Sequence, residues 1–179
     1  MIVLVGASAS GKTEVAKLLA IKYGLKKVIT HTTRLKRSGE TNGVDYHFVS
    51  EDEFLFLKSQ HAFIETTFYN HHYYGTSYQE VSDDKVLIVD ANGLKSFQAI
   101  KQPKIVTFLM VANENTRLNR MLYRGDPLDN AKKRIANDRL DFDQKKIGHI
   151  DYVINTEDIS IEQVCDKVFQ LYQQNLSNK

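Results

Sequence analysis

Short apolar runs alternate with helical patterns along most of the chain. Runs rich in β-branched residues are expected to be buried strands: 2–5, 27–31, 85–89, 104–111 and 152–154. Apolar residues at helical spacing predict three helices: 14–23, 113–123 and 160–174. Strands that alternate with helices predict a parallel sheet covered on both faces, which is an α/β fold.

The stretch from residue 33 to residue 81 breaks this alternation. It is rich in Tyr, Phe, His and Thr, and its segments VDYHFVS, AFIETTFYN and HYYG are typical of strands and turns. We therefore expect a core made of residues 1–32 and 82–179, with an inserted subdomain of mixed, mainly antiparallel structure at 33–81. The polar segment 124–139 surrounds Gly125 and Pro127 and predicts a flap that leads into a helix.

Composition and charge exclude several classes of protein. With 179 residues, 42% of them hydrophobic and 26% charged, the chain suits one globular domain with insertions. A net charge of +2 favours neither a nucleic-acid nor a membrane partner. A single Cys excludes an internal disulfide, and the opening MIVLVG lacks the basic start and long apolar stretch of a secretion signal. We expect a cytoplasmic protein.

The segment GASASGKT follows the first predicted strand and precedes the first predicted helix. It matches the Walker A pattern GxxxxGK[ST], in which backbone N–H groups and a helix N-terminus surround a phosphate. Lys12 is expected to reach the β- and γ-phosphates of ATP, and Thr13 to bind Mg²⁺. The residues predicted to bind ATP through this motif are Gly6, Ala7, Ser8, Ala9, Ser10, Gly11, Lys12 and Thr13.

Asp90 ends the predicted strand over 85–89. The carboxyl end of a parallel strand faces the ligand crevice, so Asp90 is expected to lie near Mg²⁺ in the manner of a Walker B carboxylate. The alternative is that Asp90 caps the helix that follows. Asp90 and Gly93 also match the DxxG pattern of GTPases, but the guanine-reading motif NKxD is absent, which argues against a GTPase.

A second group of polar residues lies in the insertion. Arg34 and Arg37 are three residues apart and have tyrosines nearby, a combination that can clamp a phosphate. Glu65 sits within an apolar and aromatic strand, where a charge needs a partner. The alternative is a solvated basic loop beside an edge strand.

Taken together, these segments resemble the guanylate kinase family from end to end. The resemblance is carried by GASASGKT, TTRLKRSGETNGVDYHFVS, FIETTFYNHHYYGTS, VLIVDANG, RMLYRG and YVIN. It implies a P-loop nucleoside monophosphate kinase fold with a GMP-binding insertion and a short lid. It also implies the reaction of ATP with GMP to give ADP and GDP, with Mg²⁺, in purine nucleotide metabolism, by a monomer or homodimer.

The resemblance also implies roles for individual residues. The acceptor GMP would be bound at its phosphate by Arg34, Arg37, Tyr46 and Tyr74, and at its nucleoside by Thr30, Glu65 and Thr76. Asp90 would also contact GMP. The lid would bring Arg124 and Arg134 to the phosphates, where they act with Lys12 as catalytic residues, and Asn155 would lie near adenine. Mg²⁺ would be held by Thr13 and Asp90.

The chain departs from the family pattern at several positions. Thr30 stands where Ser is usual, which keeps the hydroxyl, and Thr66 stands where an aromatic residue often follows the base-reading Glu. Ile88 occupies a position that is commonly acidic, so the handling of metal or phosphate rests on Asp90 alone. The lid segment GDPLDNAKKR is short, which makes the assignment of Arg134 less direct than that of Arg124.

Three alternatives to GMP phosphorylation remain. A kinase of the same fold with a different phosphorylated acceptor is disfavoured by Glu65 together with the arginines and tyrosines of the insertion. A catalytically inactive, protein-binding relative is disfavoured by Lys12, which such modules tend to lose. A P-loop ATPase or GTPase is disfavoured by the acceptor-site residues.

Overall fold

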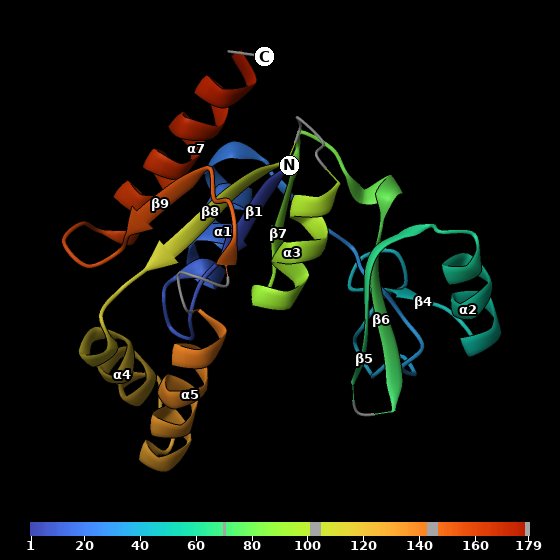
Figure 1. The fold of residues 1–179 in the computed structure, drawn as a ribbon, viewed down its shortest axis with the longest axis horizontal. Helices are drawn as coiled ribbons and strands as arrows, with labels where there is room; N and C mark the ends of the chain where they lie inside the picture. Colours follow the sequence, from blue (N-terminus) through green and yellow to red (C-terminus); the bar gives the residue numbers. More distant parts are fainter. Residues whose placement is uncertain (70, 101–104, 143–146, 178–179) are drawn as a thin grey trace.

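A five-stranded parallel sheet forms the core of the molecule (Figure 1). The structure is a computed structural model that describes residues 1–69, 71–100, 105–142 and 147–177. The strand order is β2-β7-β1-β8-β9. The strands are β1 (Ile2–Val5), β2 (Lys26–Lys27), β7 (Lys85–Ile88), β8 (Val106–Val111) and β9 (Tyr152–Asn155).

Helices cover both faces of this sheet, as the fully buried strand β1 requires. Ile2 and Leu4 face a cluster that includes α1 (Lys12–Tyr23) and α7 (Ile161–Ser177). Val3 and Val5 point to the opposite face, where α3 (Ala91–Ala99) contributes Phe97 and Leu94. The α/β fold class expected from the sequence is confirmed, and the three predicted helices are present with shifted ends.

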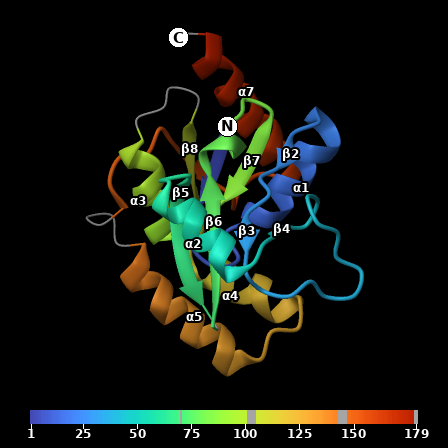
Figure 2. The same ribbon diagram turned by 90° about the vertical axis from the view of Figure 1, so that its right-hand side faces the viewer.

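The insertion forms a second sheet that stands apart from the first (Figures 1 and 2). Its order is β4-β3-β6-β5, where β3 pairs in parallel with β4 and all other pairs are antiparallel. The elements are β3 (His31–Thr32), β4 (His47–Phe48), α2 (Glu51–Ser59), β5 (Phe63–Tyr69), β6 (His72–Ser77) and the short 3-10 helix η1 (Tyr78–Glu80).

The single strand expected over residues 27–31 is wrong. The chain forms β2 in the core sheet and then β3 in the insertion sheet, because it changes pairing partner between Lys27 and His31. Val28 is still bonded to the core strand β7, and Thr30 already accepts from His47 of the insertion. The expected boundary at residue 33 stays a prediction.

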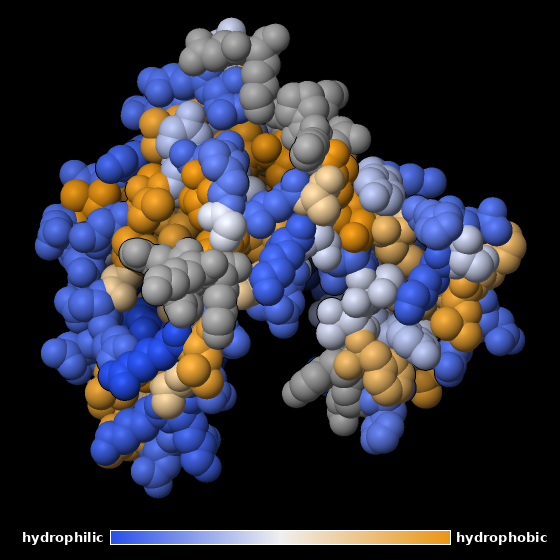
Figure 3. Space-filling model, viewed as in Figure 1, coloured by the Kyte–Doolittle hydropathy of each residue, from blue (hydrophilic) through white to orange (hydrophobic). Residues whose placement is uncertain are grey.

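Helices α4 (Glu114–Tyr123) and α5 (Leu128–Asp141) pack against each other near the carboxyl ends of the core strands. Met121, Ala131 and Ile135 form a small apolar cluster that also contacts Ala9 of the loop after β1. In Figure 1 this helical pair lies on one side and the insertion on the other, and Figure 3 shows the surface hollowed between them. No helix in the described residues is long and apolar enough to cross a membrane.

Candidate functional site

The loop between β1 and α1 is built around two glycines. A Cβ at Gly6 would lie 2.3 Å from the Met110 carbonyl oxygen, so no other residue fits beside β8. Gly11 has a φ of 96°, in the left-handed region, directly before the first turn of α1. The helix N-terminus therefore points its free N–H groups into the loop, which is the arrangement that binds a phosphate.

The side chain of Lys12 folds back over this loop. Its ammonium group donates to the carbonyl oxygens of Gly6, at 2.5 Å, and Ala7, at 2.8 Å. Burial lowers the pKa of Lys12 to about 8, with Asp138 opposing the shift and the Arg117 and Arg134 charges adding to it. Two backbone carbonyl oxygens of the loop thus hold the Lys12 side chain against the loop.

A cavity of about 670 Å³, called the donor-side or donor cavity below because the sequence assigns this loop to ATP, opens beside the loop. It is lined by Lys12, Thr13, Arg120, Tyr123, Arg124, Thr156, Ile159 and Ile161, among others. Arg120 donates to the carbonyl oxygens of Ala9, at 3.3 Å, and Thr156, at 2.5 Å, and so links α4 to the loop. Asn155, expected near adenine, does not line this cavity, although its neighbour Thr156 does, and its side-chain oxygen accepts from the Glu157 N–H.

The two predicted lid arginines share one carboxylate. Arg124 pairs with Asp126 at 2.5 Å, and Arg134 pairs with the same oxygen at 3.3 Å. Only Arg124 of the two lines the donor-side cavity, and the side chains of both are about half exposed. The structure therefore brings them together at Asp126; Arg134 does not line the cavity, but its charge is near enough to Lys12 to help lower the pKa of that lysine.

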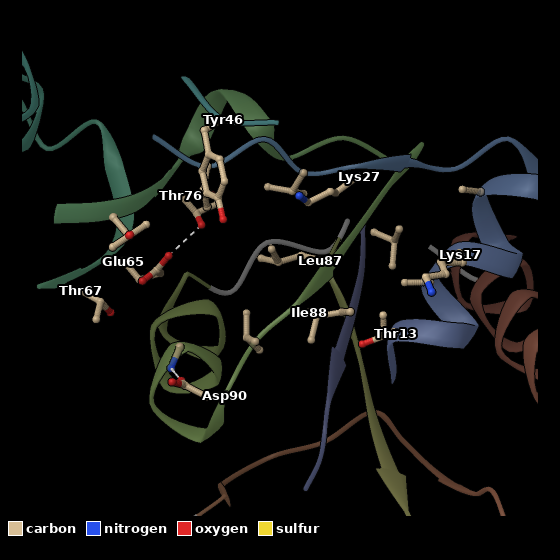
Figure 4. A pocket seen from close by; sticks show the side chains of 18 residues that line it. Thr13, Lys17, Lys27, Tyr46, Glu65, Thr67, Thr76, Leu87, Ile88 and Asp90 are labelled. Atoms are coloured by element: carbon tan, nitrogen blue, oxygen red, sulfur yellow. Dashed lines mark hydrogen bonds between the residues drawn. The ribbon is translucent and has the colours of Figure 1, made fainter. Parts of the chain in front are cut away.

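A second cavity, of about 620 Å³, lies between the core and the insertion (Figure 4). It collects most of the residues that the sequence assigns to the acceptor: Thr30, Tyr46, Glu65, Tyr74, Thr76 and Asp90. Glu65, Tyr74 and Thr76 come from β5 and β6 of the insertion sheet, and the other three come from the connections before β3, before β4 and after β7. Thr13 lines this cavity as well as the donor-side cavity, so the two meet at the start of α1.

Glu65 is held in place by the strand beside it. The Thr76 hydroxyl, which is almost fully buried, donates to the Glu65 carboxylate at 2.8 Å across the β5–β6 pair. Burial and the nearby Asp90 charge raise the pKa of Glu65, while the hydrogen bond from Thr76 opposes the rise. A half-buried carboxylate with one fixed partner has further oxygen lone pairs to offer a ligand.

Arg34 and Arg37 do not line the acceptor cavity. Arg34 donates through both terminal nitrogens to Glu40, and its guanidinium lies 5.4 Å from the centre of the Tyr46 ring. Arg37 is exposed, and its backbone N–H donates to the same Glu40 carboxylate. Glu40 therefore organises this loop, with Arg34 beside an aromatic residue that does line the cavity.

Asp90 caps α3. Its carboxylate accepts from the Gly93 N–H at 2.7 Å, which is the alternative that the sequence left open. Asp90 and Thr13 both line the acceptor cavity, but in Figure 4 the Ile88 side chain lies between them. A metal role for Asp90 stays a prediction.

Three side chains at the loop were missed in the sequence analysis. Arg117 and Arg120 of α4 and Asp138 of α5 all hydrogen-bond to residues of the loop. Arg117, Arg120 and Arg124 recur every three or four residues and so share one face of a helix, a spacing that could have revealed the first two. Asp138 follows Arg134 by four residues but belongs to no motif, so only the fold reveals it.

Comparisons with known proteins agree with this geometry. The family model described as "Guanylate kinase" matches residues 1–175. A guanylate kinase of Neisseria gonorrhoeae is 33% identical over 165 residues, covering 88% of this chain and 80% of that protein.

Solved structures give the same result. A guanylate kinase structure from Anaplasma phagocytophilum superposes with a TM-score of 0.60 at 25% identity and covers 97% of this chain and 84% of that one. A shikimate kinase structure from Acinetobacter baumannii is 18% identical to this chain and superposes with a TM-score of 0.53. The match covers 97% of this chain and 93% of the shikimate kinase chain, and the similarity is one of fold alone. The chain belongs to the guanylate kinase family of nucleoside monophosphate kinases.

Proposed function

We propose that the protein transfers the γ-phosphoryl group of ATP to GMP and releases ADP and GDP. The observation that carries the proposal is the meeting of two cavities at Thr13, one built on the phosphate-binding loop and the other on the insertion. Phosphoryl transfer needs the two nucleotides to be held in line with their phosphates adjacent. Two cavities that share the first turn of α1 supply that arrangement.

Glu65 supports guanine as the base of the acceptor. Guanine presents its N1–H and its 2-amino group side by side, and one carboxylate can accept from both. Thr76 fixes the Glu65 carboxylate, and Thr30 lines the same cavity with a further hydroxyl. Adenine has no hydrogen at N1 and no 2-amino group, so it would leave Glu65 without donors, which disfavours AMP.

Positive charge on the donor side supports transfer from ATP. Lys12 and Arg124 line the donor cavity, and Arg120 joins them from α4. They can neutralise the charge that develops on the transferred phosphoryl group.

The residues present fit Mg²⁺ bound mainly through substrate. The described residues contain no group of three or more His, Cys, Asp or Glu side chains suited to a metal, but Mg²⁺ in kinases is typically held by one or two protein oxygens, by water and by the phosphates of the nucleotide. The Thr13 hydroxyl would hold it, with Asp90 as the second predicted ligand. When bound, Mg²⁺ supplies charge neutralisation on the β- and γ-phosphates of ATP.

A coupled assay for ADP, with ATP and a panel of nucleoside monophosphates, tests the proposal. We expect GMP to be the preferred acceptor, by a factor on the order of 10⁴ over AMP, because hydrogen-bonding sites reject analogues that lack the required groups. Equal rates with all acceptors would contradict it. ADP production that does not depend on any acceptor would instead favour an ATPase, and no turnover with intact ATP binding would favour a protein-binding module.

A further inference from the structure

A buried ion pair joins the two helices that flank the phosphate-binding loop. Arg117 of α4 is 5% exposed, Asp138 of α5 is 8% exposed, and the pair is separated by 2.6 Å. Burying two charges opposes folding unless their mutual attraction offsets the lost hydration. Arg117 Nε also has no hydrogen-bond partner among the described residues, which adds a further cost. The pair is therefore poorly explained as a stabilising contact.

Both partners bond to a single residue of the loop. Ser8 donates its backbone N–H to Asp138 Oδ2 at 2.9 Å and its hydroxyl to Asp138 Oδ1 at 3.2 Å. Arg117 donates to the Ser8 carbonyl oxygen at 3.3 Å. The pair thus contacts every polar group of Ser8.

The peptide between Ala7 and Ser8 connects this pair to Lys12. No cis peptide occurs in the described residues, so this peptide is trans. In a trans peptide the N–H of Ser8 and the carbonyl of Ala7 lie in one plane and point in opposite directions. The N–H meets Asp138, and the carbonyl accepts from the Lys12 ammonium group at 2.8 Å. Fixing one end of this planar unit fixes the other.

We propose that Asp138, held by Arg117, is a positioning residue that orients the Ala7–Ser8 peptide and, through it, Lys12. The proposal rests on ATP-dependent phosphoryl transfer as the reaction, because Lys12 is the residue whose position it governs. Asp138 also opposes the lowering of the Lys12 pKa, while Arg117 adds to it. Their charges act on that pKa in opposite directions, and the role proposed for the pair is to orient Lys12.

The test removes the pair without leaving a lone buried charge. Arg117→Met combined with Asp138→Leu replaces both side chains by apolar ones of similar size, and such replacements of buried pairs are often neutral or stabilising. We expect a melting temperature close to that of the wild type, a kcat lowered at least about tenfold, and a KM for GMP within about twofold, since a misplaced catalytic group lowers kcat. A kcat within about twofold of the wild type in the folded double variant would overturn the proposal.

The same two helices offer a matched control. Arg139 of α5 pairs with Glu114 of α4 at the surface, with no bond to the loop, so Arg139→Gln with Glu114→Gln should leave kcat unchanged. An equal loss of kcat in this control would show that helix pairing alone matters and would overturn the proposal.

Two further measurements test the role of Asp138 if the double variant does not fold or if the wild type does not phosphorylate GMP. If the double variant does not fold, Asp138→Glu keeps both charges but displaces the carboxylate by one methylene, and we expect kcat to fall about tenfold; a wild-type kcat would overturn the proposal. Calorimetric titration with ADP does not depend on GMP turnover, and we expect the double variant to bind ADP several-fold more weakly than the wild type. If the wild type fails to phosphorylate GMP, the proposed function fails, and the ADP affinities still decide the role of Asp138, with equal affinities overturning it.

Discussion

Two arginines beside the phosphate-binding loop, Arg117 and Arg120, are held differently from Arg34 on the acceptor side. On the donor side, Arg117 and Arg120 reach from α4 to carbonyl oxygens of the loop after β1, more than a hundred residues away in the chain. On the acceptor side, Arg34 is paired with Glu40, six residues away in the same loop. Contacts between distant elements thus hold Arg117 and Arg120, whereas a carboxylate of the same loop pairs with Arg34.

We infer from this difference that the phosphate-binding loop is braced before substrate binds and that the acceptor side is completed by its ligand. Lys12 already lies over the phosphate-binding loop, but Arg34 and Arg37 lie outside the acceptor cavity. For either arginine to bind the GMP phosphate, the insertion must move or the Arg34–Glu40 pair must open. Closure of such parts around a substrate is a common way to exclude water before transfer.

The largest effect is expected on the preformed side, from Lys12→Met. The ammonium charge stabilises the transferred phosphoryl group as its charge develops, so kcat should fall on the order of 10³-fold with the fold intact. Single-turnover rates with ATP and GMP measure this, and Lys167→Met, at an exposed position on α7, serves as the control. A Lys12→Met variant with most of the wild-type rate would contradict the role of the loop.

Glu65→Gln tests base recognition on the acceptor side. An NH₂ group replaces one acceptor oxygen and meets a guanine donor, so kcat/KM for GMP should fall at least about a hundredfold, roughly 2.7 kcal/mol. The KM for ATP should barely change, because the donor cavity does not include Glu65. Steady-state kinetics with GMP and AMP check this against Glu51→Gln, on the exposed start of α2. An unaltered preference for GMP would remove Glu65 from base recognition.

Arg34→Met separates binding from chemistry. If Arg34 leaves Glu40 to hold the acceptor phosphate, its loss should raise the KM for GMP about thirtyfold and change kcat less, as loss of a binding contact does. Lys36→Met, in the same loop and exposed, is the matched control. A KM for GMP equal to that of the wild type would mean that the Arg34–Glu40 pair stays closed during turnover.

The smallest expected effect is the change with pH in kcat/KM for ATP, which depends on the protonation of Lys12. Lys12 must be protonated to act, and its pKa is lowered to about 8, chiefly by burial. The protonated fraction falls as pH rises through that value, so kcat/KM for ATP should drop about tenfold between about pH 7 and about pH 9. The charges that face Lys12 are those of Asp138, Arg117 and Arg134. A flat profile would contradict the lowered pKa.

The sequence predicts the donor loop better than the acceptor subdomain, for a physical reason. GASASGKT combines a short apolar strand, two glycines and a helix start, which are local signals, and the structure forms the expected strand, loop and helix there, with Lys12 lying over the loop. The strand over 27–31 failed because pairing partners, which are not local, divide it between two sheets. Likewise, nothing near Asp138 in the sequence indicates that it bonds to Ser8.

Some missed features did have a local signal. Helix α2 is capped by Ser50, whose hydroxyl accepts from the Glu53 N–H, an N-terminal capping pattern that can be read from the sequence. The apolar run over 54–57 lies on this helix, so of its residues only Phe54 is fully buried, while Phe56 is 63% exposed. Helix α3 was foreseen only as the alternative role of Asp90, which caps it.

The most direct test of the paired cavities is the affinity of a two-substrate analogue, an adenosine and a guanosine joined by a chain of phosphates. If the donor and acceptor cavities meet at Thr13, such a molecule occupies both, and its Kd measured by calorimetry should be at least about a hundredfold below that of ATP or GMP alone. Glu65→Gln should remove most of that gain. An analogue that binds no more tightly than ATP, in the wild type as in Glu65→Gln, would contradict the account.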